Sequence, residues 1–126
     1  MTLSNKVLIV DDEPFVRDIA SRVILDLKLG LEVLTARNSE EAMGILNSKD
    51  VGLALIDNDL KDSVKGTTGP LVAKAASGLG VHFIVTSSLL KEDAEQLFGR
   101  YGPRAYVRKP FKLDLLEAEV KALYSL

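Results

Sequence analysis

The sequence predicts an α/β fold in which five parallel strands form one sheet with helices on both faces. Apolar blocks of strand length alternate along the chain with segments whose apolar residues recur at helical spacing. Four of the apolar blocks are followed by polar residues. Strands that alternate with helices favour parallel pairing through right-handed crossovers, and such crossovers place helices on both faces of the sheet.

The first half of the chain is expected to contain three strands and two helices. Pro14 stands at the start of the first helix, whose apolar residues lie on one face, and Gly30 is expected to end it. Asn38, with Glu41 three residues later, is typical of a capping box at the start of the second helix. The three strands are expected at residues 6–10, 32–36 and 53–56.

The second half is expected to contain two strands and three helices. Pro70 opens a short helix that Gly78 closes, and Gly102-Pro103 breaks the helix that follows the fourth strand. That helix carries an apolar stripe, and a last helix is expected over residues 113–124. The two strands are expected at residues 81–85 and 105–107, and the stripe comprises Leu90, Ala94, Leu97, Phe98 and Tyr101.

Length, charge and composition limit the classes of protein to consider. The 126 residues suit one domain, expected to span residues 1–126, and a domain of this size buries about two-thirds of its unfolded surface. Cysteine is absent, which excludes disulfides and thiolate metal sites and fits a reducing, cytoplasmic location. A net charge of -2, with acidic and basic residues interspersed, gives no basic surface for nucleic acid. The apolar runs are too short for a membrane span, and no signal peptide is indicated.

Polar side chains stand where the predicted strands end. Asp11 and Asp12 follow the first strand, Asp57 the third, Thr86 the fourth and Lys109 the fifth. Because ligands of an open parallel sheet bind outside the carboxyl ends of its strands, these residues are expected to converge on one site. Three carboxylates, a hydroxyl and an ammonium group at one site suit a divalent cation and a phosphoryl group.

The three carboxylates are expected to repel one another unless a cation joins them. Two unit charges about 5 Å apart repel by roughly 3 kcal/mol at an effective dielectric of about 20, which corresponds to roughly two pKa units. Mg²⁺ is favoured because it binds one or two carboxylates while it keeps waters and phosphate oxygens. A carboxylate beside this metal can attack phosphorus and form an aspartyl phosphate. Lys109 would then place a positive charge on the phosphoryl oxygens, and Thr86 would donate a hydrogen bond.

Four blocks of the sequence, at residues 7–14, 55–57, 84–87 and 106–111, resemble the receiver domains of two-component response regulators. They read Val-Leu-Ile-Val-Asp-Asp-Glu-Pro, Leu-Ile-Asp, Ile-Val-Thr-Ser and Tyr-Val-Arg-Lys-Pro-Phe, in the order and spacing of that family. The resemblance covers the whole chain. It implies a flavodoxin-like, doubly wound fold with strand order 2-1-3-4-5.

The resemblance also implies roles for the acidic residues. Asp57 matches the phosphoacceptor, Asp12 a direct Mg²⁺ ligand and Asp11 a ligand that acts through water. Asp59 would supply its backbone carbonyl to the metal. A residue such as Asp57 could instead only cap a turn after a buried strand, but the presence of Asp11 and Asp12 makes this the weaker interpretation.

Three further residues match the phosphate-contacting and switching positions of the family. Thr86 and Lys109 match the pair that contacts the phosphoryl group, and Tyr106 matches the aromatic residue whose rotamer follows phosphorylation. Thr86 could also start the next helix, since hydroxyl residues are common N-caps, and Tyr106 could simply pack against the sheet. The single histidine, His82, lies in an apolar strand and is interpreted as structural.

The segment after Asp57 departs from the family pattern. Many receivers carry a proline four residues after the phosphoacceptor and a glycine soon after it, whereas this chain has Lys61 and then a long polar stretch. Long loops tend to be functional or mobile, and Gly66 and Gly69 are expected to add freedom. Ser87 replaces the small residue that is common after the switch threonine, and it is expected to narrow access to the acceptor.

We therefore expect a receiver that accepts a phosphoryl group at Asp57 from a histidine kinase or phosphotransfer protein and then changes its affinity for a downstream protein. Such a protein is a signalling module rather than an enzyme, and its only chemistry is self-phosphorylation from a donor and autodephosphorylation. Because the sequence ends with the last helix, its output is expected to be protein contacts rather than direct nucleic-acid or membrane binding. The last helix carries more apolar residues than one buried face requires, namely Leu115, Ala118, Ala122 and Leu126. These residues indicate either a contact surface, for example in a homodimer, or a broadly buried helix.

Two other functions stay open at the level of sequence. A degenerate receiver would bind its partner without phosphorylation, although the full set of polar residues argues against it. A phosphatase of the haloacid dehalogenase type is less favoured. Asp57-Asn58-Asp59 at a strand end resembles the Asp-x-Asp motif of that family. However, the metal-binding acidic motif of those enzymes follows the nucleophile, whereas Asp11 and Asp12 precede Asp57. Turnover of a generic phosphate ester would favour the phosphatase, and stoichiometric labelling would favour the receiver.

Overall fold

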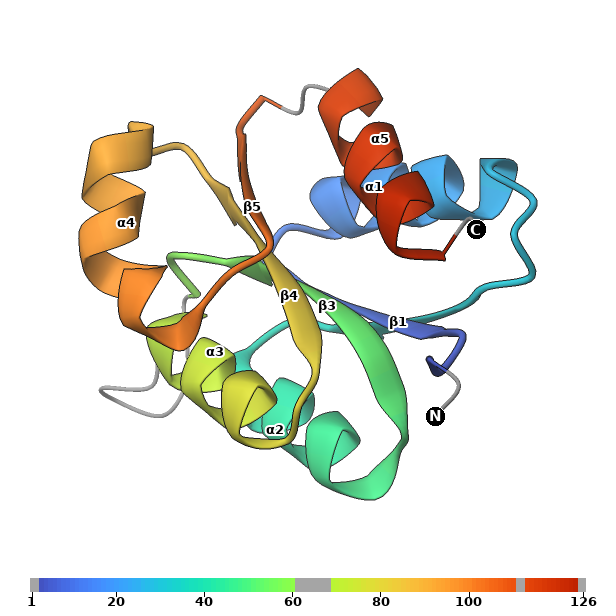
Figure 1. Cartoon of the computed structure of the whole chain (residues 1–126), viewed down its shortest axis with the longest axis horizontal. Helices are drawn as coiled ribbons and strands as arrows, with labels where there is room; N and C mark the ends of the chain where they lie inside the picture. Colours follow the sequence, from blue (N-terminus) through green and yellow to red (C-terminus); the bar gives the residue numbers. More distant parts are fainter. Residues whose placement is uncertain (1–2, 61–68, 111–112, 125–126) are drawn as a thin grey trace.

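The computed structural model describes residues 3–60, 69–110 and 113–124. Its elements are β1 (Lys6–Val10), α1 (Pro14–Asp26), β2 (Glu32–Ala36), α2 (Ser39–Ser48), β3 (Val51–Asp57), α3 (Gly69–Gly78), β4 (His82–Ser87), α4 (Lys91–Phe98), the 3₁₀ turn η1 (Gly99–Tyr101), β5 (Ala105–Arg108) and α5 (Leu113–Tyr124). The strands form one parallel sheet in the order β2-β1-β3-β4-β5, with helices on both faces (Figure 1). This architecture confirms the predicted fold class and strand order. Among the described residues, no helix has the length and apolar character that a membrane crossing needs.

The sheet separates two hydrophobic cores. One core lies under α1 and α5, where Ile24 and Leu116 pack with apolar residues of β1, β3 and β4. The other lies under α2, α3 and α4, where Val72 and Phe98 are fully buried. β3 is buried along its whole length, as expected for the central strand of a parallel sheet that helices cover on both faces. The two cores therefore hold the carboxyl ends of the strands in fixed positions.

At their carboxyl ends, β3 and β4 extend beyond the predicted ranges 53–56 and 81–85. β3 ends at Asp57, and this residue pairs in register with Thr86 of β4. Both residues are therefore held by the backbone ladder of the sheet rather than by a loop. His82, interpreted as structural, is the exposed first residue of β4 and pairs with Leu53, so it lies at the opposite end of the strand from the site.

The first helix ends earlier than predicted. α1 ends at Asp26 with Leu27 as its C-cap, so the prediction that Gly30 ends it is wrong. Lys28 has φ 55 and leaves the helix in the left-handed region, where residues other than glycine are uncommon. Gly30, with φ 72, forms the turn that leads into β2.

The cap of α2 is present in a modified form. The Asn38 Oδ1 atom accepts a hydrogen bond from the Glu41 N–H at 2.8 Å, as predicted. The Glu41 carboxylate instead accepts hydrogen bonds from the Arg37 backbone N–H at 2.9 Å and from Arg37 Nε at 3.0 Å. The capping arrangement therefore extends one residue beyond the N-cap.

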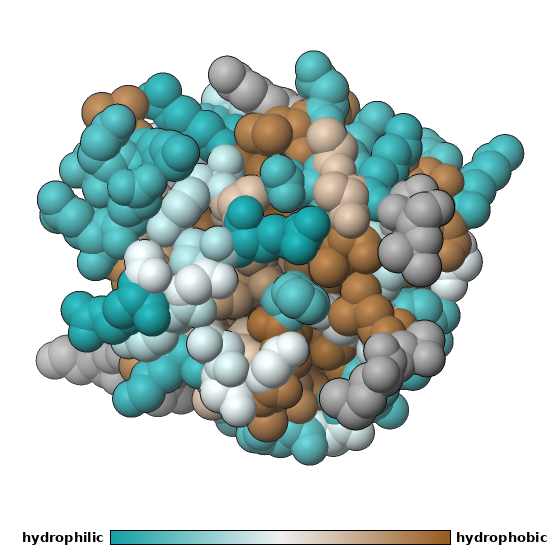
Figure 2. All heavy atoms as spheres, in the orientation of Figure 1, coloured by the Kyte–Doolittle hydropathy of each residue, from teal (hydrophilic) through white to brown (hydrophobic). Residues whose placement is uncertain are grey.

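The helix α4 is shorter than its apolar stripe indicated. It ends at Phe98, and η1 follows before Gly102, with φ 71, terminates the segment. Phe98 and Ala94 are buried, but Leu90 and Leu97 are 52% and 43% exposed, so only part of the apolar stripe faces the core. Figure 2 shows mostly hydrophilic side chains over α4 on the face that it presents.

The last helix leaves part of its apolar surface uncovered. Leu116 is fully buried, whereas Leu115, Ala118 and Ala122 are exposed. The interpretation of α5 as a broadly buried helix is therefore wrong for these three residues. Leu126, the fourth member of this series, lies outside the described residues.

Candidate functional site

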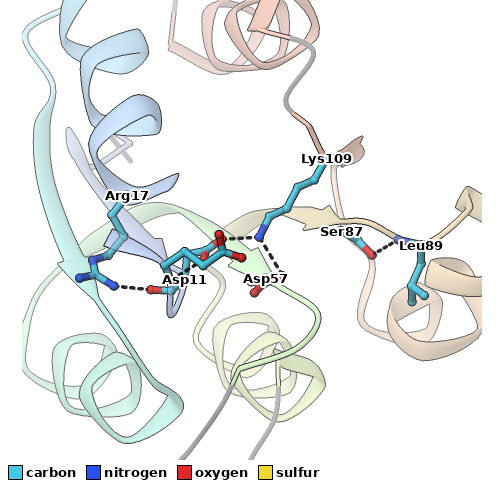
Figure 3. Close-up of polar contacts among 7 residues, drawn as sticks. Asp11, Arg17, Asp57, Ser87, Leu89 and Lys109 are labelled. Atoms are coloured by element: carbon cyan, nitrogen blue, oxygen red, sulfur yellow. Dashed lines mark hydrogen bonds and ion pairs between the residues drawn. The ribbon is translucent and has the colours of Figure 1, made fainter. Parts of the chain in front are cut away.

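The carboxyl ends of four strands bring the predicted residues to one edge of the sheet. Asp57 ends β3 and pairs with Thr86, while Asp11 follows β1 and Lys109 follows β5. Residues paired in a parallel ladder point to the same face, so the Asp57 and Thr86 side chains are neighbours. Figure 3 shows the Lys109 side chain extending toward Asp11 and Asp57. The predicted convergence of these residues is therefore confirmed.

Three carboxylates gather at this edge. Asp11, Asp12 and Asp57 each offer an oxygen atom, and these atoms lie within 4.8 Å of one another. Asp11 and Asp57 are only 1% and 4% exposed, and Asp12 is half-buried. Burial, and then the negative charge of Asp11, raise the pKa of Asp57 to about 6, against the opposing effect of Lys109. The cluster therefore holds negative charge that a bound cation would stabilise.

The Lys109 ammonium group bridges two of these carboxylates. Its Nζ atom lies 2.6 Å from Asp11 Oδ2 and 3.2 Å from Asp57 Oδ1. Burial alone would lower the pKa of Lys109, but the hydrogen bond to Asp11 and the charge of Asp57 raise it above its usual value. The backbone also anchors the residue, because the Lys109 N–H donates to the Ser87 carbonyl at 2.7 Å. The Lys109-Pro110 peptide bond is cis. A protonated lysine is thus held within reach of the buried aspartate.

An open cleft of about 660 Å³ leads to the carboxylates. Its polar end is lined by Asp12, Asp57, Asp59 and Lys109. Within the described residues, apolar side chains of α1 and of the start of α5 form much of the remaining wall. This volume lies in the range of sites that bind small molecules. Asp57 is therefore buried in the fold and still accessible from the cleft.

The residues present fit a hard divalent cation. Carboxylate oxygens, which Asp11, Asp12 and Asp57 supply, are ligands that Mg²⁺ prefers. Asp59 is exposed and lines the same cleft. An all-oxygen set favours Mg²⁺, Ca²⁺ or Mn²⁺ over metals that prefer sulfur or nitrogen ligands.

Gly69 is a site residue whose role the sequence did not indicate. It is the first residue of α3, and a Cβ atom at this position would lie 2.0 Å from the Asp57 carbonyl oxygen and 3.0 Å from the Asn58 Cα atom. The expectation that Gly69 adds freedom is therefore wrong, because only a glycine lets α3 begin so close to the Asp57 backbone. Lys61 and Gly66, the other residues singled out in this segment, lie outside the described residues.

Tyr106 lies on the face of the sheet that α4 covers. It pairs with Val85 rather than with Thr86, and it packs half-buried against the core beneath α2, α3 and α4. A small cavity of about 70 Å³ adjoins it, and Ser87 and Leu89 are among the residues that line this cavity. The Ser87 Oγ atom accepts a hydrogen bond from the Leu89 N–H at 2.9 Å. Ser87 therefore lines the Tyr106 cavity and not the carboxylate cleft, contrary to the prediction that it narrows access to the acceptor.

The fold and the polar residues at the carboxyl ends of its strands are those of a receiver domain, and comparison with known proteins identifies the same family. The sequence model of the response regulator receiver domain family matches residues 7–121, and the chain belongs to this family. It is 30% identical over 111 residues to the probable C4-dicarboxylate response regulator DctR of Bacillus subtilis (strain 168). This alignment covers 86% of the chain and 47% of DctR, so the chain spans about half the length of this relative. Membership of the family is consistent with a part in two-component signalling.

Solved receiver domains share the architecture. A CheY-like response regulator receiver domain protein from Methanospirillum hungatei JF-1 is 27% identical with a TM-score of 0.80, and the match covers 97% of this chain and 94% of that chain. The signal receiver domain of a modulated diguanylate cyclase from Desulfovibrio desulfuricans G20 is 25% identical with a TM-score of 0.80, over 94% of this chain and 92% of that chain. The match therefore extends over nearly the whole chain.

Proposed function

We propose that this receiver accepts a phosphoryl group on Asp57 from a histidine kinase or phosphotransfer protein, and that the modification changes its affinity for a downstream protein. The observation that carries the proposal is the position of Asp57, a buried carboxylate in an open cleft beside a second carboxylate and a protonated lysine. The functional unit is proposed to comprise residues 1–126, to work in the cytoplasm and to act through protein contacts rather than through direct binding of nucleic acid.

Each polar residue of the site has a role in the proposed transfer. An Asp57 oxygen attacks phosphorus, a new O–P bond forms, and the bond from phosphorus to the donor breaks with its electron pair leaving on the donor. Asp12 and the Asp59 carbonyl would bind Mg²⁺ directly and Asp11 through water, and the metal when bound offsets the charge of the phosphoryl group. The Lys109 ammonium would turn from Asp57 to the phosphoryl oxygens, which its flexible stem allows.

Incubation with a small acyl phosphate and Mg²⁺ should add one phosphoryl group per chain. Three clustered carboxylates repel an anionic donor until a cation offsets their charge. Intact mass spectrometry should find the added group in the wild type and in Asp18→Asn, an exposed carboxylate of α1 that serves as the control. The group should be absent from Asp57→Asn and after chelation of Mg²⁺. Labelling that survives Asp57→Asn would overturn the proposal.

The same experiment separates the two other functions. A degenerate receiver would take up no label, and its affinity for its partner would be the same with and without the donor. A phosphatase of the haloacid dehalogenase type would release phosphate from a generic ester over many turnovers rather than retain one group.

Thr86 and Tyr106 are proposed to carry the signal from Asp57 to the surface. Thr86 is the register partner of Asp57, which supports the proposal that its hydroxyl donates a hydrogen bond to a phosphoryl oxygen. Movement of Thr86 would free space toward Tyr106, which already adjoins a small cavity. One local bond would in this way bias the equilibrium between two states of the surface.

Replacing Thr86 by Ala should separate phosphorylation from the response of Tyr106. The variant keeps Asp57 and should still be labelled, but without the hydroxyl the Tyr106 NMR shifts and the partner affinity should change little on labelling. Thr35→Ala, which alters an exposed threonine of β2, is the matched control and should respond like the wild type. Full retention of both responses in Thr86→Ala would refute the coupling.

The exposed apolar residues of α5, which are Leu115, Ala118 and Ala122, form the proposed contact surface for a downstream protein or for a second copy of the chain. Replacing Ala118 and Ala122 by Glu should weaken that contact, because two charges would enter an apolar interface. The free energy of unfolding should change by less than about 0.5 kcal/mol, as is usual for exposed positions. Sedimentation and urea unfolding measure the two effects, and a large loss of stability with unchanged association would contradict the proposal.

A further inference from the structure

We infer that Arg17 is a positioning residue that holds the peptide between Asp11 and Asp12 in the orientation that lets both carboxylates act on one cation. Arg17 Nη1 donates a hydrogen bond to the Asp11 carbonyl oxygen at 2.7 Å (Figure 3). This contact ties the first turns of α1 to the end of β1. The inference rests on the proposed function, in which the carboxylate cluster binds Mg²⁺.

The Arg17 contact completes the polar bonding of Asp11. The Asp11 N–H donates to the Ala36 carbonyl at 3.1 Å. Its Oδ1 atom accepts a hydrogen bond from the Glu13 N–H at 3.0 Å, and its Oδ2 atom accepts one from Lys109 Nζ at 2.6 Å. With Arg17 on the carbonyl oxygen, every polar atom of Asp11 has a protein partner. Asp11 therefore cannot turn without breaking at least one of these bonds.

The carbonyl contact also determines where Asp12 lies. A peptide unit is planar, so the direction of the Asp11 carbonyl sets the plane from which Asp12 departs. Asp12 is half-buried at the cleft, whereas Asp11 is almost fully enclosed. Without Arg17 the peptide would be freer to turn, and the Asp12 carboxylate would spend less time beside the other two. Arg17 would therefore orient a metal ligand without touching the metal.

Arg17 places a positive charge near the N-terminus of α1, where the helix dipole disfavours one. Arg17 is the fourth residue of α1, whose first turn contains no acidic residue and whose N-cap, Glu13, makes no side-chain cap bond. A cation near a helix N-terminus is disfavoured by the helix dipole. Residues that oppose local preferences are expected at functional sites. Here the charge-assisted bond to the Asp11 carbonyl offsets the cost.

Titration with Mg²⁺ distinguishes positioning from a simple effect of charge, because the two predict opposite signs. If Arg17 acted only as a nearby cation, Arg17→Met would tighten Mg²⁺ binding by removing a repulsion. If Arg17 positions the peptide, the same variant should bind Mg²⁺ about tenfold more weakly, as is typical when a residue that orients a metal ligand is lost. Calorimetry with magnesium chloride measures the dissociation constant, and Arg22→Met, an exposed arginine on the same helix, should leave it unchanged.

Arg17→Lys tests whether any hydrogen-bond donor at this position is sufficient to orient the Asp11 carbonyl. Lysine has a similarly long side chain and N–H donors, so this variant should recover most of the Mg²⁺ affinity that Arg17→Met loses. Without metal, the Asp12 and Glu13 amide resonances should shift in Arg17→Met and stay close to their wild-type positions in Arg17→Lys, with thermal unfolding in chelator confirming that each variant is folded. Mg²⁺ binding by Arg17→Met as tight as that of the wild type, or tighter, would overturn this inference alone. Failure of the wild type to bind Mg²⁺ would overturn the proposed function with it.

Discussion

Replacing Asp57 by Asn is expected to stabilise the metal-free protein at neutral pH by up to about 3 kcal/mol, which is the free energy that corresponds to about two pKa units. Burial and the charge of Asp11 raise the pKa of Asp57 from 3.8 to about 6 in the folded state. A carboxyl group with a raised pKa stabilises the fold fully below the pKa of the unfolded state, and this contribution is lost as the pH rises through the folded pKa. The wild type should therefore lose stability between about pH 4 and about pH 6. Asn does not ionise and should remove this loss, while Lys109 keeps Asp11 as its partner.

Urea unfolding in the presence of chelator measures this effect. Asp57→Asn should exceed the wild type in stability at pH 7, and the difference should shrink toward pH 4. Asp50→Asn, which neutralises an exposed carboxylate, should change stability little at either pH. Mg²⁺ should stabilise the wild type more than Asp57→Asn, because a ligand that binds only the folded state stabilises that state. An Asp57→Asn protein that is no more stable than the wild type at pH 7 would contradict the assigned cost of this buried charge.

Replacing Gly69 by Ala is expected to destabilise the protein by about 1–3 kcal/mol, the usual cost of overpacking. The new Cβ atom would lie 2.0 Å from the Asp57 carbonyl oxygen and 3.0 Å from the Asn58 Cα atom. Both are backbone atoms, so neither can rotate away, and either the start of α3 or the end of β3 has to shift. Because that shift would displace Asp57, labelling by an acyl phosphate should also slow.

Gly44→Ala is the matched control for Gly69→Ala. Gly44 lies within α2, and a Cβ atom there would meet nothing within 4 Å. Alanine at this position should therefore stabilise the protein by about 0.5–1 kcal/mol, because glycine lowers the stability of a helix interior. Urea unfolding should show opposite signs for the two variants. A Gly69→Ala protein as stable as the wild type would contradict the close approach of α3 to Asp57.

The sheet and most of the site could be predicted because both follow from local patterns in the sequence. Apolar blocks of strand length located the strands, and the convergence of Asp11, Asp57 and Lys109 follows because the carboxyl ends of parallel strands meet at one edge. Gly69 and Arg17 act through contacts between different helices and strands, and the spacing of residues along the chain does not reveal such contacts. Gly69 was expected to add freedom to the chain, but it instead allows α3 to begin close to the Asp57 backbone.

The errors at helix ends and on helix surfaces have physical causes as well. Gly30 is a typical helix terminator, yet Lys28 already adopts a left-handed conformation, so the helix ends before the glycine. The exposure of Leu90 and Leu97 depends on how a short helix is rotated about its axis against the sheet. Eight residues of α4 contain too few turns for periodicity alone to determine that rotation.

The central claim is that Asp57, and no neighbouring carboxylate, carries the phosphoryl group. Borohydride reduces an acyl phosphate to an alcohol, so protein labelled by an acyl phosphate and then reduced should contain homoserine at the labelled position. Peptide mass spectrometry after proteolysis identifies this position, and unlabelled protein treated in the same way is the control. Homoserine is expected at position 57, with intact aspartate at Asp11, Asp12 and Asp59. Homoserine at any of those three positions, or at none of the four in protein that has gained a phosphoryl group, would contradict the claim.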